Sequence, residues 1–151
     1  MAGSPTNAAG SGVDPRGLRF AATVTAIVLA IVLVTSSPIL LAVQAIVFAL
    51  GAFGGMRRSP YGLTFRYLIA KRLGKPAELE AEPPPRFAQA VGLVFAFVGV
   101  IGYASGLGWL GVVATAFAFV AAFLNAAFAY CLGCEMYLLI RRFTLRKGVP
   151  A

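Results

Sequence analysis

The chain has 151 residues, of which 60% are apolar and 12% are charged, and its formal net charge is +8. Soluble domains carry about 25% charged residues because water must wet their surface, so this composition excludes an ordinary soluble domain and predicts that apolar side chains face lipid. The length allows one domain, and the absence of histidine excludes histidine-based catalysis and histidine ligation of haem or metals.

The N-terminal segment, residues 1–13, consists mainly of small and polar residues. Such a segment cannot bury enough apolar surface to fold, so we predict a disordered tail. A signal peptide is disfavoured because the apolar stretch that follows is longer than a signal core. We place the membrane domain at residues 14–143 and a basic C-terminal tail at 144–151.

Two long runs without a charged residue predict the transmembrane segments. They cover Phe20–Met56, 37 residues, and Phe87–Cys134, 48 residues. A hydrocarbon core of about 30 Å needs roughly 20 helical residues, so each run is long enough for a hairpin of two helices. We therefore expect an all-α, polytopic membrane protein with four spans, at about 18–35, 38–56, 87–104 and 109–131.

Each run contains a segment that disfavours helix. In the first run this is Thr35–Pro38, where Pro38 removes a backbone donor and restricts the residue before it. In the second it is Gly102–Trp109, which contains three further helix-weakening residues, Ser105, Gly106 and Gly108. These segments predict the two hairpin turns.

The basic residues predict the orientation. All 13 lie before the first span, in the 57–86 loop or after the fourth span, and neither hairpin turn carries one. Because Lys and Arg concentrate in cytoplasmic loops, we expect a multi-pass protein of the cell membrane with both termini and the 57–86 loop in the cytosol. Cations that flank spans meet anionic headgroups, so we do not expect a nucleic-acid partner.

The cytosolic segments carry weaker patterns. Tyr61–Leu73 mixes apolar residues with cations and predicts a helix on the membrane surface. Glu78, Glu80 and Glu82 fit a solvated acidic linker better than a metal or acid–base site, and the prolines at 83–85 predict an extended connection. Within 135–143, apolar residues recur at helical spacing, which predicts a second interfacial helix.

The sequence Cys131-Leu132-Gly133-Cys134 contains both cysteines of the chain. The spacing suits a dithiol that closes to a disulfide, or half of a tetrahedral thiolate site. The cytosol keeps thiols reduced, so reactive or metal-ligating thiols are expected rather than a static disulfide, with small apolar packing residues as the alternative. If Gly133 breaks the helix, the pair lies at a helix N-terminus that favours an anion. If the helix continues, both thiols lie on one helical face in an apolar setting, which raises their pKa and lowers their reactivity.

Several polar residues accompany the cysteines. Glu135 is a candidate base or proton carrier for a thiol, or a partner of Arg141 or Arg142. Inside the spans, Asn125 and Gln44 are expected to form hydrogen bonds between helices. Supporting polar side chains at the same end are Asn125, Gln89, Tyr130 and Tyr137.

Five segments carry a further signal: Val13–Arg16, Arg19-Phe20, Pro60–Gly62, Pro84–Gln89 and Asn125–Tyr137. Together they resemble the DUF4395 family of small membrane proteins common in actinobacteria, and the last segment is the most specific. The resemblance covers roughly residues 13–143. It implies a membrane topology and supplies no catalytic roles. Members are often encoded beside thioredoxin-like proteins and rhodanese-type sulfurtransferases, which implies such partners.

The leading hypothesis is a membrane protein that exchanges thiols and disulfides, or sulfane sulfur, through Cys131 and Cys134 with a soluble partner. Two alternatives remain open. One is a non-catalytic scaffold or accessory subunit, and the other is a homodimer that shares a four-cysteine metal site. The sequence leaves enzymatic activity undecided and predicts no cofactor.

Overall fold

The computed structural model describes residues 12–148, and most of them are helical. Within that range, extended pairing is limited to an isolated bridge between Val13 and Glu80. The elements in chain order are α1 (Pro15–Thr35), α2 (Pro38–Gly54), η2 (Met56–Arg58), α3 (Pro60–Thr64), η3 (Phe65–Ile69), α4 (Ala70–Leu73), α5 (Pro83–Ala104), α6 (Gly108–Phe128) and α7 (Leu132–Gly148). The all-α prediction is confirmed.

Three helices, α1, α5 and α6, are long and apolar enough to cross a membrane, with 21, 22 and 21 residues. The fourth apolar helix, α2, has 17 residues. Many large apolar side chains on these helices are exposed, for example Val34 at 85% and Phe53 at 76%. Such surfaces are unfavourable in water and favourable in lipid, so the helices are those of a membrane protein.

The helix boundaries follow from local chemistry. The Asp14 carboxylate accepts a hydrogen bond from the Arg16 backbone N–H and caps α1, and the Ser37 hydroxyl accepts one from Leu40 N–H and caps α2. Pro15 and Pro38 occupy first helical positions, where a missing N–H costs nothing. The expected extended connection at 83–85 is wrong for the same reason, because these prolines form the first turn of α5.

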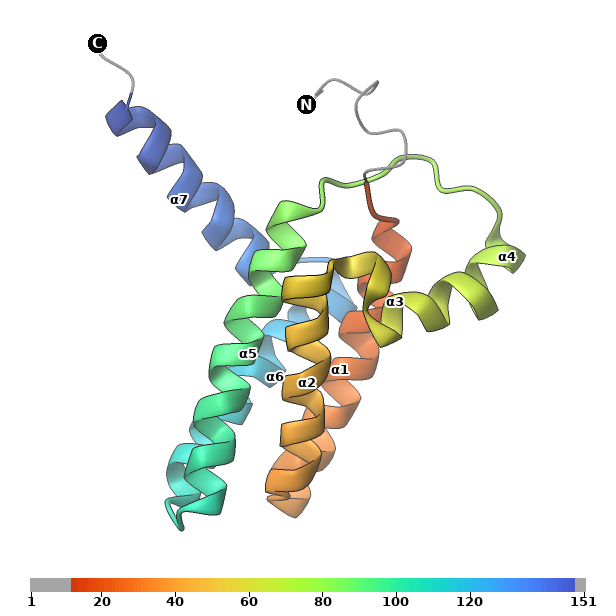
Figure 1. The fold of residues 1–151 in the computed structure, drawn as a ribbon. Coiled ribbons are helices and arrows are strands. Elements are labelled where there is room, and N and C mark those ends of the chain that lie inside the picture. Colours follow the sequence, from red (N-terminus) through yellow and green to blue (C-terminus); the bar gives the residue numbers. More distant parts are fainter. Residues whose placement is uncertain (1–11, 149–151) are drawn as a thin grey trace.

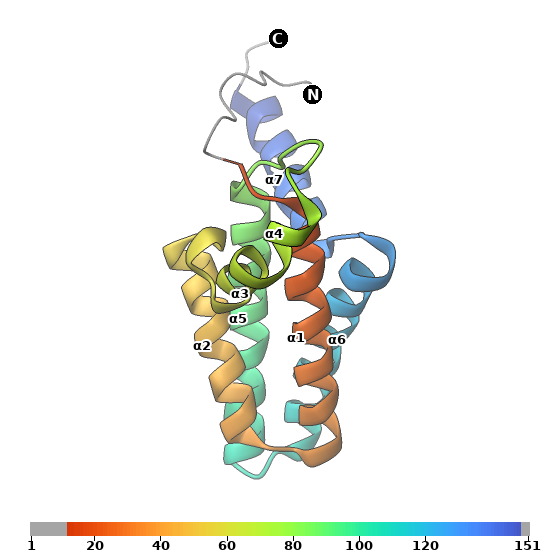
Figure 2. The same ribbon diagram turned by 90° about the vertical axis from the view of Figure 1, so that its right-hand side faces the viewer.

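The four long helices alternate in direction, as Figures 1 and 2 show. The connections after α1 and after α5 lie at one end of the bundle, and α3, α4 and α7 lie at the other. The helix α1 packs mainly against α6, α2 packs mainly against α5, and α5 also packs against α6. Residues distant in sequence are therefore brought together at the α1–α6 and α2–α5 contacts.

The core of the bundle is a cluster of six buried residues from all four long helices: Leu29, Val32, Leu41, Phe48, Ala96 and Ala118. Small residues let α2 approach α5 closely, since a Cβ at Gly92 would lie 2.9 Å from a ring carbon of Phe48. Glycines at the contacts between helices are consistent with this close approach.

Residues 60–73 form one helical stretch, interrupted by the π-helical turn η3, that packs on α1. Phe65 is buried, and its ring centroid is 5.9 Å from that of Phe20. The Tyr61 hydroxyl donates to Gln44 Oε1 at 2.7 Å. The helix expected at 61–73 is therefore present, and the partner expected for Gln44 comes from it.

The first turn of α5 is hydrogen-bonded to the C-terminal end of α2. Arg86 donates to the carbonyls of Ala52 and Phe53, at 3.0 and 3.3 Å, and so satisfies two acceptors that a helix end leaves free. Glu82 Oε2 accepts from Met56 N–H at 2.9 Å. One member of the acidic trio is thus bound to the backbone rather than solvated.

At both ends of the described chain, the structure differs from the predicted domain boundaries. Val13, the last residue of the predicted tail, is buried and exchanges two backbone hydrogen bonds with Glu80. Gly12 beside it is also buried, and the rest of that tail, residues 1–11, lies outside the described residues. The helix α7 continues to Gly148, five residues past the predicted domain boundary, and residues 149–151 also lie outside.

Candidate functional site

The cysteines follow an abrupt change of direction between α6 and α7. The helix α6 ends at Phe128, three residues before the predicted end of the span, and Ala129 takes a left-handed conformation with φ of 56°. Ala129 N–H donates to the Asn125 carbonyl and Tyr130 N–H to the Leu124 carbonyl, which satisfies the end of α6. The helix is therefore broken before the cysteines, at Ala129, and not at Gly133.

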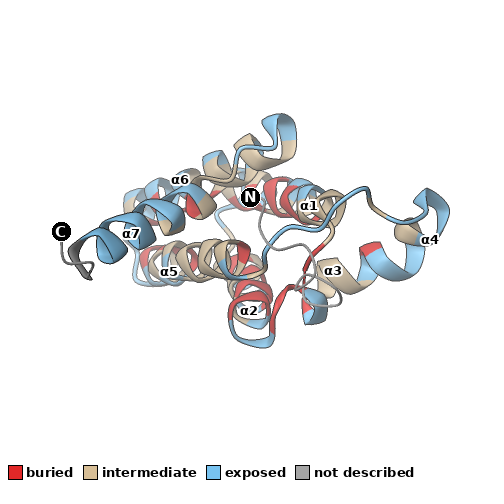
Figure 3. Cartoon of the chain, turned by 90° about the horizontal axis from the view of Figure 1, so that it is seen from above, coloured by how far each residue is buried: buried red, intermediate tan, exposed pale blue. Residues whose placement is uncertain are grey.

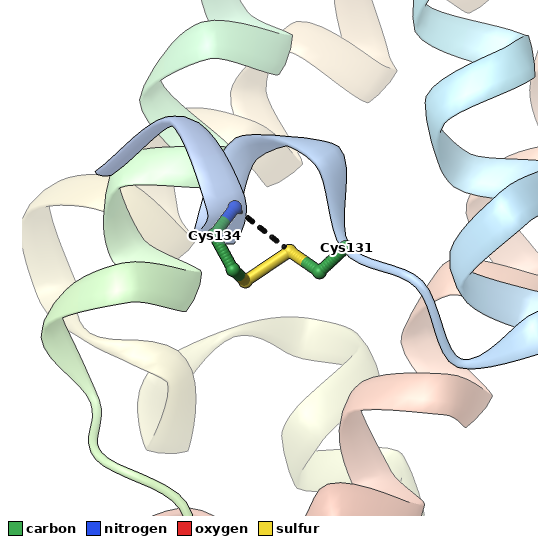
Figure 4. Close-up of a disulfide and its surroundings, with 2 residues drawn as sticks. All are labelled: Cys131 and Cys134. Carbon is green, nitrogen blue, oxygen red and sulfur yellow. Dashed lines mark hydrogen bonds between the residues drawn. A yellow bond between two sulfur atoms is a disulfide. The ribbon is translucent and has the colours of Figure 1, made fainter. Parts of the chain in front are cut away.

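Cys131 and Cys134 form a disulfide across the first turn of α7, with a Cα–Cα distance of 5.1 Å (Figure 4). Cys134 N–H donates to Cys131 Sγ at 3.1 Å, and Glu135 N–H donates to the Cys131 carbonyl at 3.0 Å. Cys131 thus occupies the capping position of α7. The sequence favoured reduced thiols because the cytosol keeps thiols reduced. In the structure the two cysteines are instead oxidised to a disulfide.

The first turns of α7 pack on α5. Gly133 is buried, and a Cβ at this position would lie 2.5 Å from the Ala88 Cβ. The rings of Phe87 and Tyr137 are 5.7 Å apart. Beyond these turns α7 projects from the bundle, and Figure 3 shows it exposed along most of its described length.

A cavity of about 330 Å³ begins at the two cysteines and extends into the bundle between α1, α5 and α6. Its deep wall includes Thr25, Phe95 and Phe117, which lie near the middle of their helices. Much of the remaining wall consists of small residues: Ala21, Ala22, Ala88, Gly92, Ala118, Ala121, Ala122 and Gly133.

Besides Thr25, four polar side chains line the cavity: Arg19, Glu80, Gln89 and Asn125. Arg19 Nη2 donates to the Ala126 carbonyl at 3.0 Å and so joins α1 to the last turn of α6. Gln89 lies against Gly51, whose added Cβ would be 2.8 Å from Gln89 Oε1. Partial burial raises the pKa of Glu80 above its ordinary value, and the charge of Glu78 raises it further.

The comparisons with known proteins give one match. A family model described as a domain of unknown function, DUF4395, matches residues 13–142. The chain belongs to the DUF4395 family. No curated protein and no solved structure matches it. The resemblance inferred from the sequence segments is therefore confirmed over most of the chain.

The structure of this DUF4395 protein brings together four of the seven predicted site residues, because Cys131, Cys134, Asn125 and Gln89 line the same cavity. The other three do not line it. Tyr130 is exposed, and Tyr137 packs on Phe87.

Glu135, the predicted base or proton carrier, is exposed. The pairing considered for it with Arg141 or Arg142 is not formed, since the ion pair found between described residues joins Arg16 and Asp14. Its carboxylate lies in the first turn of α7, where a negative charge stabilises the helix.

Sequence reasoning missed Arg19 and Glu80 as residues that line the same cavity as the cysteines in this DUF4395 chain. Arg19 is placed by the packing of α1 on α6, and Glu80 by the pairing of its backbone with Val13. Neither contact leaves a local pattern in the sequence. In the described part of the chain, no three Cys, Asp or Glu residues are grouped as metal ligands. A metal site shared between two chains stays a prediction.

Proposed function

We propose that this DUF4395 protein crosses the cell membrane four times and uses Cys131 and Cys134 for disulfide exchange with a soluble cytosolic protein. The observation that carries the proposal is the disulfide at the capping position of α7. An N–H group of the first turn already donates to Cys131 Sγ at 3.1 Å. A helix N-terminus and such a donor favour a thiolate, which is the reactive form of cysteine.

The exchange has two steps. In the reduced protein the Cys131 thiolate attacks one sulfur of the partner's disulfide, which forms a mixed disulfide and releases the partner's other sulfur as a thiolate that takes up a proton. Cys134, after losing its proton, then attacks Cys131 Sγ and forms the intramolecular disulfide. The partner leaves with two thiols, having gained the two electrons that the cysteine pair has lost, and the reverse sequence oxidises a partner.

The exchange is tested by trapping. In the Cys134→Ser variant the second step is blocked, so Cys131 should remain joined to a cytosolic protein in a band that reducing agent removes. The matched control is Cys131→Ser, which lacks the attacking sulfur and should trap far less. If neither variant traps a protein, the exchange proposal fails and the scaffold alternative gains support.

The identity of the trapped protein decides between the two chemistries. A thioredoxin-like partner, held through a disulfide, agrees with the proposal. A rhodanese-type partner, with a further sulfur atom detected on Cys131 by mass spectrometry, would redirect the proposal to sulfane-sulfur transfer. A homodimer with zinc or iron bound to reduced cysteines would support the shared metal site instead.

The orientation part of the proposal rests on the distribution of charge over the bundle. The described arginines and lysines lie at the end that carries α3, α4 and α7, while the connections at residues 36–37 and 105–107 are uncharged. Single cysteines placed at Ser36 and Ser105 in a Cys131→Ser, Cys134→Ser background should react with an impermeant maleimide added outside intact cells. Labelling only after lysis would contradict the four-span orientation.

A further inference from the structure

The cavity next to the disulfide is larger than disulfide exchange with a soluble protein requires. We propose that it binds a membrane-soluble quinone, which takes up the electrons of the reduced Cys131–Cys134 pair. The proposal rests on the exchange function and extends it, because it assigns the second electron carrier of the same pair.

The position of the cavity favours a ligand that arrives from the bilayer. It extends from the cysteines to Thr25 of α1 and Phe95 of α5. Thr25 lies ten residues into α1, a depth of roughly 15 Å at the helical rise of 1.5 Å per residue. A ligand at that depth is surrounded by helices whose outer faces are apolar.

The walls of the cavity suit a flat ring with a polar edge. Phe48, Phe95 and Phe117 provide aromatic surface in the deeper part. The volume of about 330 Å³ lies within the range of small-molecule pockets, roughly 300–1,000 Å³. Small side chains around the aromatic groups leave this space open.

The polar donors lie at the same end of the bundle as the sulfurs. Arg19 is in the first turns of α1, Gln89 in the first turns of α5 and Asn125 in the last turn of α6. A quinone carries carbonyl oxygens that accept hydrogen bonds, and guanidinium and amide groups donate them. The positive charge of Arg19 also stabilises the negative charge that develops on a quinone oxygen during reduction.

The reaction balances without a further reagent. The two thiols give up two electrons and two protons, and a bond forms between Cys131 Sγ and Cys134 Sγ. The quinone gains the two electrons in its ring, and its two carbonyl oxygens take up the two protons, which gives a quinol. The oxidised pair then accepts electrons from the soluble dithiol partner, so each cycle passes two electrons from the cytosol to the membrane.

A lipid acyl chain is the other apolar occupant that a bilayer offers. An acyl chain has no acceptor for Arg19, Gln89 or Asn125 and does not react with a dithiol. The polar residues and the sulfurs at one end of the cavity therefore favour the quinone, and the lipid becomes an outcome of the test.

The test uses the full-length protein in phosphatidylcholine nanodiscs without oxygen. After reduction and removal of the reductant, decylubiquinone is added, because its fully substituted ring does not undergo thiol addition readily. Quinol is followed by absorbance and free thiols by maleimide mass shift. We expect one quinol for each disulfide formed.

Two substitutions on α6 form a matched pair. Ala121 lines the cavity, and Ala121→Phe should slow quinol formation by roughly tenfold or more, the factor that corresponds to about 1.4 kcal/mol. Ala127 is exposed and outside the lining, and Ala127→Phe should leave the rate unchanged. Diamide, a small soluble oxidant, should close the disulfide in both variants at the same rate.

Three results would overturn the proposal. They are no quinol in the wild-type protein, equal rates for the two α6 variants, and loss of quinol formation when extra phospholipid competes for the cavity. Wild-type protein that exchanges with a soluble disulfide and produces no quinol would overturn the quinone site alone, whereas loss of both reactions would overturn the exchange function as well. If Ala121→Phe does not fold, Asn125→Leu replaces it and should raise the quinone concentration needed for half-maximal rate.

Discussion

Gly133 of α7 lies directly against Ala88 of α5, so that a Cβ at position 133 would be 2.5 Å from the Ala88 Cβ and 2.6 Å from its Cα. The Gly133→Ala substitution should therefore push α7 away from α5 and lower the unfolding temperature in detergent. Overpacking of this kind costs about 1–3 kcal/mol. The control is Gly108→Ala, where an added Cβ meets nothing within 4 Å. Equal unfolding temperatures for the two variants would contradict the close contact.

Arg86 should stabilise the bundle through the carbonyls of Ala52 and Phe53. Arg86→Met keeps the aliphatic part of the side chain and removes both hydrogen bonds, so we expect a loss of about 2 kcal/mol, typical of bonds to a charged group. Thermal unfolding in one detergent measures it. Arg142→Met, on the exposed part of α7, serves as the control and should change little; a similar loss in both would show a general effect of charge.

The hydrogen bond between the buried Gln44 and the half-buried Tyr61 should add little net stability, but removing one partner should be costly. Tyr61→Phe removes the donor to Gln44 Oε1 and should lower stability by about 1 kcal/mol, as for other hydrogen bonds between membrane helices. Gln44→Leu combined with Tyr61→Phe should recover the loss, because the Gln44 amide nitrogen is buried without a hydrogen-bond partner among the described residues. A double variant less stable than Tyr61→Phe would contradict this.

The two thiols of the reduced protein should differ in reactivity. Cys131 Sγ accepts the Cys134 N–H at the start of α7, which favours its thiolate. With iodoacetamide near neutral pH, the Cys134→Ser protein, which retains Cys131, should be alkylated faster than the Cys131→Ser protein. The same two proteins in denaturant should react equally. A faster reaction of Cys134 would assign the attacking role to the other sulfur.

Glu80 should make the stability depend on pH. Partial burial and the neighbouring Glu78 raise the pKa of Glu80, so the folded protein retains this proton to a higher pH than the unfolded chain does. The resulting stabilisation is complete below the ordinary value of 4.5 and is lost as pH rises through the raised pKa.

Glu80→Gln stays neutral and should therefore raise the unfolding temperature near pH 7 but hardly near pH 4. Glu78→Gln removes only the neighbouring charge and should give a smaller gain. A Glu80→Gln protein that is less stable at neutral pH would show that the ionised carboxylate contributes a favourable contact.

Much of the architecture could be predicted because the bilayer imposes a simple rule on composition. The charge-free runs and Pro38 located the helices and the first turn, since lipid excludes charge and proline lacks a donor. The end of α6 could not be predicted in this way. Alanine favours helix, and no glycine or proline marks the left-handed turn at Ala129, which is closed by bonds to the Asn125 and Leu124 carbonyls.

The candidate site was predictable only in its sulfur atoms. Cys131 and Cys134 lie three residues apart in sequence, and their spacing indicates their chemistry. Arg19 and Glu80 reach the same cavity from segments more than 50 residues away. The cavity itself gives no sequence signal, because Ala121 and Gly92 would look the same whether the space beside them were filled by a neighbouring helix or left open.

The short length of α2 has a consequence for the surrounding lipid. Its 17 residues span about 25 Å at 1.5 Å per residue, less than the hydrocarbon thickness of about 30 Å. Its neighbour α5 has 22 residues, and the bonds from Arg86 hold the start of α5 to the end of α2. If α2 crosses the membrane as proposed, thinning of the bilayer beside it is one way to accommodate the short span. The protein would then create a hydrophobic mismatch on one side only, and should partition into thinner membrane regions with its α2 face toward the thinnest lipid.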